Sequence, residues 1–123
     1  MKDKFYFVLA WAARLVGAWA LGNGALHNMA VLGQDHEYDR EFLYLLMIGA
    51  ILFFCGLLNI IVSWGLRQNR LLALNVGAVA TLFVIALCVA LIPVFPATGM
   101  MVVHLALLAM LAAGYLLRIK AGK

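Results

Sequence analysis

Two histidines, His27 and His104, are the residues of this sequence that are best placed to do chemistry. His27 lies near the end of the first long apolar run, and His104 is the only strongly polar residue of the last one. Each lies about five residues from the same end of the bundle that these runs would form, so both imidazoles should lie about 7 to 8 Å below one surface. Two imidazoles at equal depth can meet, and we expect them to face the same interior space.

Methionine gathers at the same end and extends the chemistry that these imidazoles could support. The candidate metal ligands are His27, His104, Met29, Met100 and Met101. Imidazole together with thioether suits Cu(I), whereas two facing imidazoles can hold the iron of a b-type haem. The cofactor alternatives are therefore haem b and copper. A purely structural role is the other interpretation, because methionine fills irregular gaps and an intramembrane imidazole can be a satisfied packing residue. A proton-handling or quinone-type site is a further alternative.

The first apolar run, residues 11–32, positions His27 through its small residues. Helices associate in lipid by close backbone approach, because lipid provides no hydrophobic drive. Small residues occur at steps of three and four along one stripe, formed by Ala13, Gly17, Ala20 and Gly24. The next position on this stripe is His27, which we therefore expect to face protein. Asn23 lies between two glycines that favour a kink, and its amide is a further candidate for ligand binding.

The composition is compatible with only one class of protein. The chain has 123 residues, of which 67% are hydrophobic and 11% are charged. Such a chain cannot keep a soluble surface hydrated, so we expect an integral membrane protein. Four apolar runs predict a single all-α transmembrane domain, a four-helix bundle with antiparallel neighbouring spans. The expected spans are residues 11–32, 44–64, 71–92 and 99–117.

Loop charge predicts the orientation of these spans. Seven basic residues fall on one side, namely Lys2, Lys4, Arg67, Arg70, Arg118, Lys120 and Lys123, whereas Arg40 stands alone on the other. By the positive-inside rule both termini are cytoplasmic, in the inner membrane of the cell. The sequence pI of about 9.4 reflects this distribution, and we expect no nucleic-acid partner.

Several residues inside the spans are expected to have structural roles. Gly49 and Gly56 recur at a seven-residue interval in the second span, as in the seam of a left-handed helix pair. Asn59 and Asn75 lie at nearly equal distances from the turn between spans two and three, so their amides are expected to pair. Arg14 lies in the first turn of the first span, where its guanidinium can reach the headgroups.

Part of this pattern resembles the DoxX-like family of small four-helix bacterial membrane proteins. The similarity lies in Arg14 to Gly17 leading toward Gly24 in the first span, and in Gly49 to Gly56 followed by the short basic turn at 67–70. It covers the first three spans. The resemblance implies a compact four-helix bundle, with a link to membrane redox or sulfur metabolism in some members. It assigns no functional residue.

Three functions are compatible with the sequence. The first is an accessory or scaffold subunit that contacts the lipid bilayer, binds a lipid or another hydrophobic ligand, and works in a homo-oligomer or a larger membrane complex. The second is a haem- or copper-binding redox protein that uses His27 and His104. The third is a small oligomeric transporter or channel. The expected spans contain no acidic residue, which argues against a proton-coupled exporter. We identify no catalytic residue and do not expect an enzyme.

The topology can be tested by labelling single cysteines in intact cells. A cysteine placed between Gly33 and Arg40 should react with a membrane-impermeant thiol reagent added from outside, because the charge distribution puts this segment on the outer side. A cysteine placed between Arg67 and Arg70 should be protected until the membrane is permeabilised. The opposite labelling pattern would overturn this orientation.

Overall fold

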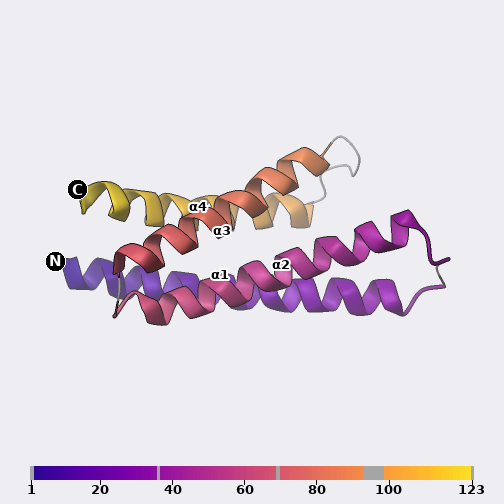
Figure 1. Ribbon diagram of the computed structural model, residues 1–123, viewed down its shortest axis with the longest axis horizontal. Helices are drawn as coiled ribbons and strands as arrows, with labels where there is room; N and C mark the ends of the chain where they lie inside the picture. The colour runs from indigo at the N-terminus through magenta and orange to yellow at the C-terminus, as the bar shows by residue number, and fades with distance from the viewer. Residues whose placement is uncertain (1, 36, 69, 93–98, 123) are drawn as a thin grey trace.

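The computed structural model has an all-helical architecture (Figure 1). It describes residues 2–35, 37–68, 70–92 and 99–122, with side chains at all of these except 2, 3, 99 and 100. Within these residues it has four helices, α1 (Lys2–Leu32), α2 (Arg40–Gly65), α3 (Arg70–Leu91) and α4 (Gly99–Ala121). All four are long and apolar enough to cross a membrane, which confirms the predicted all-α class and indicates a multi-pass membrane protein. The break expected between spans three and four, at 93–98, lies outside the described residues.

The helices are longer than the spans expected from hydropathy. α1 begins at Lys2 and is continuous through Asn23, where a kink was expected, and α4 continues to Ala121. α2 begins at Arg40, because the side chain of Asp39 caps it by accepting a hydrogen bond from the backbone N–H of residue 42 at 2.9 Å. A helix does not have to end where the hydrocarbon ends, so hydropathy alone underestimated these lengths.

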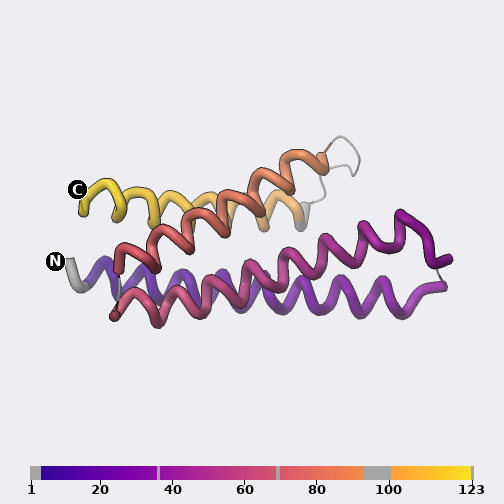
Figure 2. Tube along the Cα trace, in the orientation of Figure 1, coloured from indigo at the N-terminus to yellow at the C-terminus, as the bar shows by residue number. Residues whose placement is uncertain are grey.

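The helices are arranged as two pairs of unequal reach (Figure 1). α1 lies along α2, and α3 lies along α4, while α2 also contacts α3. Both termini and the α2–α3 turn lie at one end of the molecule. At the other end the α1–α2 pair extends beyond the α3–α4 pair, as the Cα trace shows (Figure 2). The ends of the four helices are therefore not level on that side.

The α1–α2 pair is held at very short range by glycines. A Cβ atom added at Gly24 would lie 2.5 Å from the carbonyl oxygen of Gly49 and 2.6 Å from the backbone nitrogen of Phe53. A Cβ added at Gly17 would lie 2.7 Å from the carbonyl oxygen of Gly56. Real Cβ atoms essentially never come so close to backbone atoms, so hydrogen is the only side chain that fits. The spacing of seven residues on both helices brings the glycines together in two layers.

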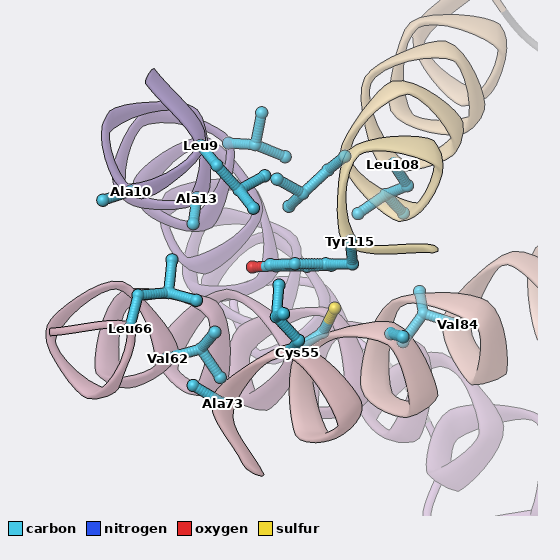
Figure 3. Packing of buried hydrophobic residues seen from close by; sticks show 14 residues of the cluster. Leu9, Ala10, Ala13, Cys55, Val62, Leu66, Ala73, Val84, Leu108 and Tyr115 are labelled. Carbon is cyan, nitrogen blue, oxygen red and sulfur yellow. The ribbon is translucent and has the colours of Figure 1, made fainter. Parts of the chain in front are cut away.

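A polar cluster buried among apolar side chains connects α2 to α3 and α4. Tyr115 is fully buried among apolar side chains (Figure 3). It lies over Gly77, where an added Cβ would be 2.6 Å from the Tyr115 Cζ. Its hydroxyl donates a hydrogen bond of 2.7 Å to Oδ1 of Asn59, and Oγ1 of Thr81 donates to the same oxygen at 3.4 Å. The Asn59 amide nitrogen donates to the carbonyl oxygen of Cys55 at 2.9 Å.

The prediction that the amides of Asn59 and Asn75 pair is wrong. Both are at similar distances from the turn, but Asn59 bonds Tyr115 and Thr81 instead. Asn75 is exposed on the outside of α3. Distance from a turn predicts the depth of a residue, but it does not predict the rotation of the helix about its axis, and α3 is rotated so that Asn75 faces away from the bundle.

The glycine contacts predict opposite effects for two neighbouring substitutions on α1. Gly24→Ala should lower the free energy of unfolding by about 1 to 3 kcal/mol, because its methyl group meets the backbone of α2. Gly22→Ala should leave the free energy unchanged or raise it by up to about 1 kcal/mol, because nothing lies within 4 Å of the added atom and alanine favours a helix. Denaturation in a mild detergent measures both values. Equal effects of the two substitutions would contradict the close approach.

Candidate functional site

The two imidazoles singled out by the sequence have separate partners. Nε2 of His27 lies 2.9 Å from the carbonyl oxygen of Leu45, which can only accept, so this nitrogen carries the proton. Nδ1 of His104 accepts a hydrogen bond of 3.0 Å from the indole N–H of Trp19. The Trp19 and His104 rings meet edge to face with their centroids 6.0 Å apart. Each imidazole thus joins two helices, His27 joining α1 to α2 and His104 joining α4 to α1.

The expectation that His27 and His104 lie at equal depth is wrong. The partner of His104, Trp19, precedes His27 by about two turns of α1, or about 12 Å along the helix. The reason is the unequal reach of the two pairs (Figure 2). Depth was counted from the helix ends, and those ends are not level.

The other candidate ligands do not complete a metal site in the described part of the chain. Asn23 donates from its amide to the carbonyl oxygen of Trp19 at 2.8 Å, within α1. Met29 is 68% exposed, Met101 is half-buried, and the side chain of Met100 lies outside the described residues. Among the side chains described, no three histidine, cysteine, aspartate or glutamate residues gather to hold a metal. The two imidazoles expected to hold haem or copper are not brought together.

A different site lies at the end of the molecule that carries both termini. It is a partly open cavity of about 190 Å³, lined by residues from the start of α1 and from the α2–α3 turn. We call it the arginine pocket, because three arginines and three aromatic residues line it together with Ala10 and Leu66: Arg14, Arg67, Arg70, Tyr6, Phe7 and Trp11. The α1 residues that contribute form two adjacent rows at steps of three or four, residues 6, 10 and 14 and residues 7, 11 and 14, which places them on one face of that helix. Arg67 and Arg70 come from either side of the short turn that follows α2.

Arg14 forms the inner wall of the arginine pocket and is held in place there. Its Nε donates to the hydroxyl of Ser63 at 3.0 Å, and Ser63 in turn donates to the carbonyl oxygen of Ile60 at 2.6 Å. Its guanidinium carbon lies 5.1 Å from the centre of the Trp11 ring. Within the described residues Arg14 makes no other hydrogen bond and no ion pair. Its terminal N–H groups therefore remain available to a ligand.

The rim of the arginine pocket brings further positive charge together around aromatic rings. The guanidinium carbon of Arg70 lies 4.3 Å from the centre of the Tyr6 ring, and that of Arg118 lies 5.8 Å from the same ring. Arg118 also lies 3.8 Å from the centre of the Phe5 ring, and its buried Nε has no hydrogen-bond partner. Cation–π contacts stabilise these guanidinium groups against the aromatic rings.

The electrostatics of this end favour an anionic ligand. Among the side chains that the structure describes, no acidic one lines the arginine pocket. Four of the five acidic residues of the sequence lie instead between residues 35 and 41, at the α1–α2 connection on the opposite end. Arginine binds phosphate and carboxylate groups with two parallel hydrogen bonds. The arrangement can therefore bind a phosphate or carboxylate group, with aromatic rings against its apolar part.

The arginine pocket was not predicted from the sequence, in which the basic residues indicated only an orientation. A usable signal was present in α1, where Tyr6, Phe7, Trp11 and Arg14 share one helical face. What the sequence does not contain is the rotation of α1 against α2, which brings that face to the α2–α3 turn.

The chain matches no family model, no curated protein and no solved structure. What the protein binds is therefore inferred from the chemistry of its own side chains.

The separate environments of the two histidines can be tested by measuring unfolding free energies of single and double variants. Trp19→Phe and His104→Phe should be coupled by about 0.5 to 1.5 kcal/mol, because together they make one hydrogen bond. His27→Phe and His104→Phe should be additive within about 0.5 kcal/mol, as expected for distant residues. A large coupling free energy between the two histidine substitutions would instead support a shared site.

Proposed function

We propose that this protein is a small accessory or scaffold subunit of the inner membrane that binds an anionic phospholipid through the arginine pocket. The observation that supports this most directly is the convergence of Arg14, Arg67 and Arg70 on one open cavity whose lining, within the described residues, contains no carboxylate. The lipid bilayer supplies phosphate groups at the depth where such residues lie. A lipid is also the most abundant anion that can reach a site bordered by aromatic rings in the interface.

The geometry of the arginine pocket suits a phosphate with its apolar chains lying outside. Arg67 and Arg70 are exposed at the turn, whereas Arg14 is half-buried beside Ser63, about one helical turn further into the bundle. A volume of about 190 Å³ accommodates a headgroup and not two acyl chains. Phe7 and Trp11 are 61% and 46% exposed next to it, so acyl chains would lie against aromatic surface.

The proposed orientation supports the same ligand. We place the antiparallel helices with both termini in the cytoplasm, which puts the arginine pocket at the inner leaflet. That leaflet carries anionic lipids and a negative surface potential, to which each nearby Lys or Arg is attracted by about 1 kcal/mol. In this orientation the excess of basic loop residues and the arginine pocket lie on the same side of the membrane.

The other two functions draw less support from the geometry. Haem or copper binding was expected to use His27 and His104. His27 bonds Leu45 of α2, whereas His104 bonds Trp19, which lies about two turns before His27 along α1. A transporter or channel needs a polar path along the spans. The buried polar residues Asn59, Ser63 and Thr81 are hydrogen-bonded within the bundle. Lipid binding needs only the side chains that already line the arginine pocket.

Lipid selectivity tests the proposal with a matched pair of variants. The purified protein should retain phosphatidylglycerol in preference to phosphatidylcholine, as measured by native mass spectrometry of detergent-solubilised samples. Arg67→Gln should weaken phosphatidylglycerol binding about tenfold or more, because a charge-assisted hydrogen bond contributes about 1.5 to 3 kcal/mol. Lys120→Gln removes the same charge from the same end of the molecule but not from the pocket, and should change binding less than twofold.

Two outcomes would contradict the proposal. One is equal retention of the two lipids by the unmodified protein. The other is an equal loss in Arg67→Gln and Lys120→Gln, which would show that general charge, and not the arginine pocket, attracts the lipid.

A further inference from the structure

One amide lies on the outside of the bundle without a partner. Asn75 is exposed on α3, and its side-chain amide makes no hydrogen bond within the described part of the chain. It lies about 7.5 Å along α3 from its first residue, Arg70. α3 is apolar enough to cross a membrane, so this side chain faces hydrocarbon. An amide in hydrocarbon is unfavourable unless both its donor and its acceptor are hydrogen-bonded.

The surface around Asn75 is otherwise apolar and hollowed. An open groove of about 440 Å³ runs between α2 and α3, and Asn75 is its one polar lining residue in the described part of the chain. Its other walls are Leu58 from α2 and Val76, Val79, Ala80 and Phe83 from α3. None of the described residues that line this groove is charged, so they offer an ionic partner no countercharge.

The exposed face of α3 also has the spacing of a helix-pairing seam. Six exposed residues follow one another at alternating steps of three and four, namely Leu72, Asn75, Val79, Leu82, Ala86 and Val89. This is the spacing at which two helices cross at a small angle and interdigitate side chains over their whole length. A single amide in such a seam fixes the register of the pair.

We propose that this face binds a second copy of the chain, with Asn75 hydrogen-bonded to Asn75 of the partner subunit. An amide carries both a donor and an acceptor, so two copies related by a twofold axis satisfy each other with two reciprocal bonds. The membrane inserts both copies in the same orientation, which brings identical residues to the same depth. A twofold axis along the membrane normal beside Asn75 therefore pairs α3 with α3. The arginine pocket, on α1 and the α2–α3 turn, does not include this seam.

Energy transfer between donor- and acceptor-labelled protein in vesicles of phosphatidylcholine tests the dimer. The unmodified protein should associate, and the association should fall as lipid is added at constant protein. Asn75→Val should weaken the association constant about tenfold, because it removes the amide pair and keeps a similar shape. Asn75→Gln keeps the amide and should associate within about threefold of the unmodified protein.

Two control variants separate the interface from general effects. Asn23→Val makes the same change at an amide that already bonds within α1, so association should be unchanged. Combining Asn75→Val with Val79→Asn moves the amide one turn along the same seam and should restore association. Equal melting temperatures of the purified monomers establish that each variant is folded. A monomeric unmodified protein, or an Asn75→Val variant that associates as strongly as the unmodified protein, would overturn the dimer.

Discussion

The distance between α1 and α2 is the constraint on which the other features of this protein depend. Gly17 and Gly24 leave no space between their backbone and that of α2, where Gly56 and Gly49 lie opposite. In a bilayer this short distance supplies the dispersion contacts that hold the pair together. It also sets the register in which Arg14 reaches Ser63, and thereby the inner wall of the arginine pocket. A wider pair would leave that guanidinium without its buried partner.

A second constraint joins the two pairs of helices. Asn59 uses both ends of its amide, donating to the carbonyl oxygen of Cys55 and accepting from Tyr115 and Thr81. These partners lie on three different helices, and Tyr115 can reach between them because Gly77 leaves room for its ring. Interhelical hydrogen bonds in lipid contribute about 0.6 to 2 kcal/mol each. α2 thus contacts α1 by close backbone packing together with the Arg14–Ser63 and His27–Leu45 bonds, whereas its polar bonds to α3 and α4 are made by Asn59.

Sequence patterns predicted the features that depend on one helix at a time. The number of apolar helices follows from hydropathy, and the seven-residue spacing of Gly49 and Gly56 pointed to a face of close approach. Features that need the rotation or relative height of two helices were not predictable. The amide of Asn59 was expected to pair at equal depth with Asn75, whereas α3 is rotated away. His104 was placed at the wrong height, because the two helix pairs end at different levels.

The unequal reach of the two helix pairs also affects the surrounding bilayer. α1 has 31 residues and α3 has 22, so they are about 46 Å and 33 Å long. The length of α3 is close to the ordinary hydrocarbon thickness. The part of the α1–α2 pair that extends beyond the α3–α4 pair therefore lies among the lipid headgroups, unless the pair tilts. The outer turns of α1 and α2 thus meet the headgroup layer above the level at which α3 ends.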